Sequence, residues 1–139
     1  MTRRGFTIIE TLVAVALAAS IASTGTLLCS SIASTFRLAA SARTLVQVMR
    51  ETRARAMAEG VALDVAFDAS TSNWSIRTVA GTVRRTEVLP APVRFQALPV
   101  RARIRFASTG SADNGTIVLG TGAASRRIIV NQRGRARLS

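Results

Sequence analysis

The sequence predicts an α+β fold in which one long N-terminal helix packs on a small antiparallel β-sheet domain. Three observations indicate this fold. An apolar segment opens the chain, a segment with helical periodicity follows it, and a series of short segments rich in alternating or β-branched residues fills the remainder. Because the helical part precedes every predicted strand, the strands should pair antiparallel and pack against the helix.

Composition narrows the function before any motif is considered. The chain of 139 residues carries 19 basic residues, all of them arginine, against 7 acidic ones, and it has no histidine. Such a charge favours anionic partners, either phosphate backbones or lipid headgroups. A histidine-based catalytic triad is excluded, and the single Cys29 lies in an apolar run, which argues against a typical zinc site. We therefore expect no enzyme, no cofactor, no metal and no small-molecule substrate.

The first part of the predicted helix covers residues 6–29. Its apolar run is long enough to cross about 30 Å of hydrocarbon as a helix. Arg3 and Arg4 precede it, which favours a cytoplasmic N-terminus and places the remainder of the chain across the membrane. The small residues 18–20 also resemble a cleavage site, so an ordinary signal peptide is the alternative interpretation.

Glu10 is the one carboxylate in this apolar run. An ionisable group at such a position costs several kcal/mol unless it finds a partner, and nothing else in the segment can neutralise it. The partner should therefore come from outside the chain.

The residues around Glu10 resemble a known motif. Gly5-Phe6-Thr7-Ile8-Ile9-Glu10-Thr11-Leu12-Val13-Ala14 is similar to the prepilin motif of type IV pilins and type II secretion pseudopilins. The resemblance implies that residues 1–5 are a basic leader, which prepilin peptidase removes between Gly5 and Phe6 before Phe6 is N-methylated. It also implies that Glu10 pairs with the N-terminal amine of a neighbouring subunit during assembly.

Residues 30–60 continue the helix as an amphipathic segment. Small or helix-favouring residues dominate, and proline and glycine are absent until Gly60, which makes a natural stop. A largely apolar stripe at spacings of three and four should cover the β-domain, whereas Ser41 falls on the opposite, polar face. The stripe consists of Leu38, Ala42, Leu45, Met49, Thr52 and Ala56.

Residues 61–139 are predicted to form the β-rich domain with a basic C-terminal tail. Asp64 and Asp68 alternate with apolar residues and are expected to be surface charges, while Trp74 is expected in the core. The predicted strands are 61–68, 74–78, 83–89, 93–98, 101–107, 116–119, 126–131 and 135–138.

Weaker motifs along the whole chain narrow the resemblance to the GspH/FimT family. They are the segment 53–60, Val93-Arg94-Phe95 after a proline, Ile104-Arg105-Phe106 before Gly110, and the closing segment 127–137. The resemblance implies a pilin-like minor subunit of a type II secretion pseudopilus or a type IV pilus. Such a subunit is a single-pass inner-membrane protein with a periplasmic domain. It acts with other pilins in filament initiation, tip assembly and protein secretion.

The C-terminus leaves a second function open. Some FimT-like members bind DNA for uptake through a Gly-Arg-x-Arg motif, which this chain has as Gly134-Arg135-Ala136-Arg137. Arginine forks bind phosphates bidentately, and a flexible tail could follow a backbone without reading bases. Alternating arginines also fit the solvated face of an edge strand, so both interpretations stand. Arginines nearby in sequence are Arg126, Arg127 and Arg133, and the row Arg101, Arg103 and Arg105 could widen a basic surface.

Overall fold

The computed structural model describes residues 7–122 and 124–139, without the side chains of residues 21–30. The chain divides into two compact units between Ala33 and Ser34. In the described part of the chain, one helix, α1, runs from Ile8 to Glu59, and the eight strands all belong to the second unit. The order of one long helix followed by short strands is the predicted one.

Both ends of α1 have local causes. At the start, the Thr7 hydroxyl accepts a hydrogen bond from the Glu10 amide at 3.3 Å, which is the contact of an N-cap residue. At the end, Gly60 adopts a left-handed conformation with φ of +68° and stops the helix at the predicted position.

The part of α1 in the first unit leaves its apolar side chains exposed from Ile8 to Leu17. Within the residues described, no helix has both the length and the hydropathy that crossing a membrane requires.

The strands form two four-stranded antiparallel sheets, where the sequence led us to expect one. The first sheet has the order β3-β2-β1-β5 and the second β4-β6-β7-β8. Pro90 and Pro92 lie between β3 and β4, and β4 pairs with β6 of the second sheet. The strands are β1 (Leu63–Asp68), β2 (Asn73–Thr78), β3 (Val83–Val88), β4 (Arg94–Ala97), β5 (Arg103–Phe106), β6 (Gly115–Gly120), β7 (Ser125–Val130) and β8 (Ala136–Leu138).

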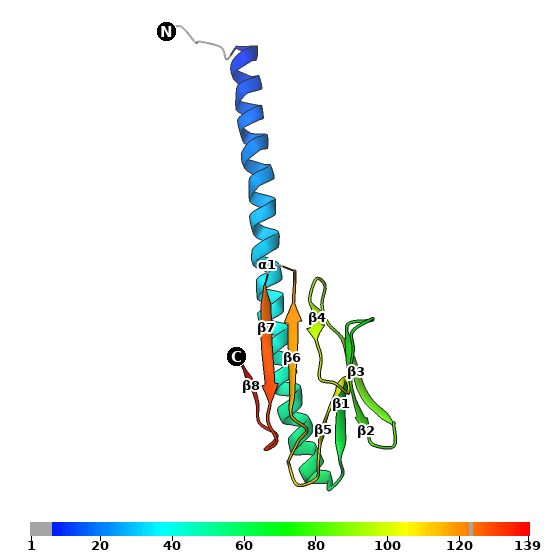
Figure 1. Ribbon diagram of the computed structural model, residues 1–139. Coiled ribbons are helices and arrows are strands. Elements are labelled where there is room, and N and C mark those ends of the chain that lie inside the picture. Colours follow the sequence, from blue (N-terminus) through cyan, green and yellow to red (C-terminus); the bar gives the residue numbers. More distant parts are fainter. Residues whose placement is uncertain (1–6, 123) are drawn as a thin grey trace. The chain divides into compact units, whose positions relative to one another are not determined.

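The residues of α1 from 34 to 59 belong to the second unit and are called the second part of α1. One hydrophobic core joins them to the two sheets. In Figure 1, β6, β7 and β8 run along this part of the helix, and β1, β2 and β3 lie beside them. All six residues of the predicted stripe are buried, and Trp74 is buried as predicted. Ser41, Val46 and Val48 are buried as well. The placement of Ser41 on the polar face was therefore wrong, because two sheets cover a wider stripe of the helix than one sheet would.

Candidate assembly and anion-binding sites

Glu10 is the described member of the predicted N-terminal site, since Gly5 and Phe6 lie outside the described residues. It stands at the third position of α1, and its backbone N–H is held by Thr7. Its side chain is exposed, and the ion pairs found among the described residues do not include its carboxylate. Within residues 7–122 and 124–139, the backbone N–H of Glu10 takes part in capping and the carboxylate takes part in no ion pair.

Gly134 of the C-terminal motif is a packing residue. It lies in the turn between β7 and β8, where its N–H donates to the Asn131 carbonyl at 2.9 Å and its φ is +71°. A Cβ at this position would lie 2.3 Å from the Gly110 carbonyl oxygen and 2.7 Å from Arg53 Nε. The glycine is needed so that the turn can approach both neighbours, and Gly134 itself is buried.

Arg137 lies in β8 and Arg135 directly precedes it, in agreement with the strand predicted at 135–138. Ala136 is buried between them, opposite Val130 on β7, and the two arginines are exposed. The period of two along a strand places both guanidinium groups on the side away from the core. Arg127 of β7 occupies the same outer face. The other predicted arginines, Arg126 and Arg133, are exposed at the start of β7 and in the turn.

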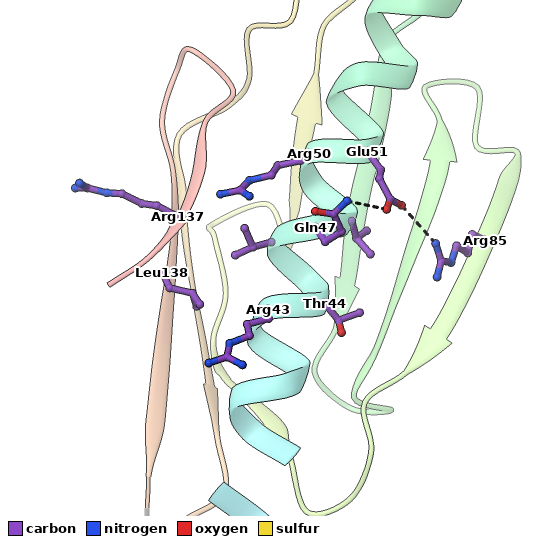
Figure 2. A pocket seen from close by; sticks show the side chains of 10 residues that line it. Arg43, Thr44, Gln47, Arg50, Glu51, Arg85, Arg137 and Leu138 are labelled. Carbon is purple, nitrogen blue, oxygen red and sulfur yellow. Dashed lines mark hydrogen bonds and ion pairs between the residues drawn. The ribbon is translucent and has the colours of Figure 1, made fainter. Parts of the chain in front are cut away.

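Arginines of α1 extend this basic surface, and the sequence analysis did not assign them to it. Arg43 and Arg50 line a groove of about 680 Å³ beside β8, together with Arg137 and Leu138 (Figure 2). A neighbouring hollow of about 730 Å³ is lined by Arg50, Arg53, Arg135 and Arg137. The seven-residue spacing of Arg43 and Arg50 puts them on one helix face, and this was the signal that could have identified them.

On the opposite wall of the groove in Figure 2, the charged side chains are paired with one another. Glu51 accepts a hydrogen bond from Gln47 at 3.1 Å and lies 3.9 Å from Arg85 of β3. The Arg85 guanidinium also stands 5.3 Å from the centre of the Trp74 ring. These contacts tie the edge strand β3 to the helix, so the charges on this wall are satisfied within the chain.

The sequence led us to expect that Arg103 and Arg105 could widen the basic surface and that Asp64 is a surface charge. The structure contradicts both expectations, because the three side chains pair with one another. Asp64 is only 3% exposed, and Arg103 Nη1 and Arg105 Nε donate to its two carboxylate oxygens at 2.6 and 2.7 Å. The antiparallel register places Asp64 opposite Arg105, and the sequence alone could not reveal this pairing. Of the predicted row, Arg101 is exposed and precedes the strand.

Arg103 and Arg105 lower the pKa of the Asp64 carboxyl. Burial alone would raise the pKa of this carboxyl, but the hydrogen bonds from Arg105 and then Arg103 outweigh it, so the pKa lies below its ordinary value. The same hydrogen bond raises the pKa of Arg105. Asp64, Arg103 and Arg105 are therefore all charged, and their ion pairs are a structural contact.

Solved structures with similar folds come from two kinds of filament system. The minor pseudopilin EpsH from the type 2 secretion system of Vibrio cholerae matches with a TM-score of 0.62 and 15% identity, covering 74% of this chain and 96% of that one. The type IV minor pilin FimU of Pseudomonas aeruginosa matches with a TM-score of 0.61 and 18% identity, covering 73% and 87%. At these identities the likeness concerns the fold.

The sequence itself identifies the family. No curated protein matches the chain. The profile of the family described as type II transport protein GspH matches residues 41–134, which include most of the second part of α1, the strands from β1 to β7 and Gly134. The GspH/FimT resemblance of the sequence motifs is thereby confirmed, and the chain belongs to the GspH family of minor pseudopilins.

Proposed function

We propose that this chain is a minor pilin-like subunit that acts in filament initiation or tip assembly, in type II secretion or in a type IV pilus. The observation that carries the proposal is the contrast within α1. The family match covers a domain with a closed core, whereas the segment that begins at Ile8 has exposed apolar side chains and an outward-facing Glu10. Such a segment needs an apolar environment from other subunits or from lipid.

Removal of the leader would produce the N-terminus that takes part in filament assembly. Prepilin peptidase cuts between Gly5 and Phe6, and N-methylation follows on Phe6. Before assembly the apolar residues 6–29 anchor the chain once through the inner membrane, with the N-terminus cytoplasmic and the domain periplasmic. In the filament, Glu10 pairs with the Phe6 amine of a neighbour. Support comes from the sequence motif, the basic leader and the exposure of the Glu10 side chain.

Replacement of Glu10 tests the assembly contact. Glu10→Ala should leave leader cleavage largely intact and reduce recovery of the subunit in the sheared filament fraction by at least about tenfold. Thr7→Ala is the matched control, because it removes the capping hydroxyl and keeps the carboxylate. Normal incorporation of Glu10→Ala, or an equal loss in Thr7→Ala, would contradict the pairing role.

A second function, DNA binding for uptake, is favoured by the charge of the second sheet. Residues 114–139 hold five arginines and no acidic residue. The ion pairs among the described residues lie on α1 and the first sheet, and none of them involves the arginines of the second sheet. Arg127, Arg135 and Arg137 share its outer face, with Arg43 and Arg50 beside it. A polyanion there would be bound through its backbone, without sequence preference.

The DNA proposal requires a charge-matched comparison. The protein is titrated with duplex DNA at several salt concentrations. The double variant Arg135→Ala/Arg137→Ala should weaken binding at least about tenfold and lower the salt slope by about 1.8. Arg84→Ala/Arg85→Ala removes the same charge from β3, where carboxylates already pair both arginines, and should have little effect. Equal losses in both variants would show that only net charge matters.

A further inference from the structure

The outer face of the first sheet holds more positive charge than its carboxylate can balance. Asp64 lies in register with Arg77 of β2 on one side and Arg105 of β5 on the other. Both of its oxygens are taken from the β5 side, by Arg103 and Arg105. One carboxylate therefore stands among three guanidinium groups, and Arg101 adds a fourth at the end of β5.

Arg77 is the group that this arrangement leaves unsatisfied. Its Nη2 donates to the Ser75 hydroxyl at 2.9 Å, but its Nε is buried and has no hydrogen-bond partner. A buried N–H on a charged group without an acceptor costs free energy, and a nearby anion would remove that cost. The register brings Arg77 beside Asp64, but the hydrogen bonds that the described residues donate to this carboxylate come from Arg103 and Arg105 and not from Arg77.

Arg77 also lines a hollow on this face of the sheet. It has a volume of about 390 Å³, and Arg77, Arg101 and Arg103 line it together with Asp64. Ala66 and Ala102 contribute small side chains to its walls, which leaves room for a ligand group between the guanidinium forks. The three arginines and one aspartate that line the hollow leave a local charge of about +2, so a second anionic group could be accommodated there.

We propose that this hollow binds one oxyanion of the phosphate type, held by Arg77, Arg101 and Arg103. A dianion matches the excess charge better than a monoanion, and its several oxygens can accept from more than one guanidinium group. The ligand is either free phosphate or the headgroup of a phosphomonoester lipid, which present the same chemistry. The site is on the first sheet and shares no arginine with the proposed DNA surface, so the two can be tested separately.

The test is a titration of the purified full-length chain in neutral detergent with inorganic phosphate, at constant ionic strength set by chloride. Saturable binding that raises the unfolding temperature is expected. Arg77→Ala and Arg101→Ala should each weaken it about tenfold or more, whereas Arg94→Ala, an exposed arginine of the second sheet, should change it less than about twofold. Because Arg101 is exposed, its variant remains informative even if Arg77→Ala does not fold.

A vesicle arm separates the two sources of phosphate. Phosphatidylcholine vesicles with and without phosphatidic acid are compared. Acid-dependent binding that Arg101→Ala removes supports the lipid headgroup, and phosphate binding without it supports the free anion. The proposal is overturned if the wild-type chain shows no saturable phosphate binding, or if Arg94→Ala weakens binding as much as the two site variants do.

Discussion

The two parts of α1 treat their apolar side chains in opposite ways. Ile8, Leu12 and Leu17 are between 60% and 80% exposed, whereas Leu38, Leu45 and Met49 are at most 1% exposed. The second part is buried by the sheets of its own chain. The first part has no such cover within the described residues, so its hydrophobic stabilisation must come from outside. Under the proposed function, folding and assembly depend on different stretches of one helix.

The largest effect should come from a matched pair of leucines on this helix. Leu45→Ala leaves a cavity in the core and should lower the free energy of unfolding by about 3 kcal/mol. Leu12→Ala should leave it nearly unchanged, because Leu12 is 64% exposed, and should instead reduce incorporation into filaments. Denaturant unfolding and filament recovery are measured for both variants. Equal destabilisation would break the division between the two parts of α1.

Gly134 tests how the second sheet is held against the second part of α1. Gly134→Ala should cost about 2–3 kcal/mol, since the new Cβ meets both Gly110 and Arg53 and the backbone is left-handed. Gly60→Ala is the control with nearly the same φ, and a Cβ there meets nothing within 4 Å. It should cost only about 1 kcal/mol. Chemical denaturation checks the difference, and equal costs would mean that the close approach is unimportant.

Asp64 tests whether the first sheet also contributes stability to the second unit. Asp64→Asn leaves Arg103 and Arg105 beside a neutral group and should cost about 2 kcal/mol, a value reduced because both arginines are partly exposed. Asp113→Asn removes the same charge from an exposed loop position and should have little effect. If the two variants unfolded alike, the buried contact would carry no specific stability.

The smallest effect is a pH dependence with a defined sign. The pKa of Asp64 is lower in the folded chain than its ordinary value of 3.8, so its charged form stabilises the fold. The stability difference between the wild type and Asp64→Asn should be complete above about pH 5 and shrink as the pH falls through the folded pKa. Asp68 accepts hydrogen bonds from Ser70 and Thr71, which lower its pKa to about 2. Because Asp68 is present in both proteins, its titration cancels in the difference between their stabilities. A difference independent of pH would show that the charge of Asp64 is irrelevant.

Periodicity predicted the parts of the fold that depend on local pattern. The buried stripe of α1, the stop at Gly60 and all eight strands follow from spacings within a few residues. Features that depend on pairing between distant segments were not predictable in this way. The split into two sheets, the burial of Ser41 and the contacts of Asp64 all depend on which strands meet.

The candidate sites were also predictable only where they depend on local sequence. Glu10, Arg135 and Arg137 were predicted from motifs, and each is exposed. Gly134 belonged to the predicted DNA-binding set, but its close approach to Gly110 became visible only in three dimensions. Arg43 and Arg50 join Arg137 across more than eighty residues of sequence, and the pairing of Arg103 and Arg105 with Asp64 requires knowledge of the β1–β5 register.

The most direct test of the proposed assembly role is the intact mass of the protein recovered from filaments of cells that carry the whole assembly machinery. The account predicts a chain that begins at Phe6 with one added methyl group, and it predicts that replacement of Gly5 leaves the chain unprocessed in the cell membrane. Recovery of a chain that still begins at Met1, or of one cut after residues 18–20, from assembled filaments would contradict the account.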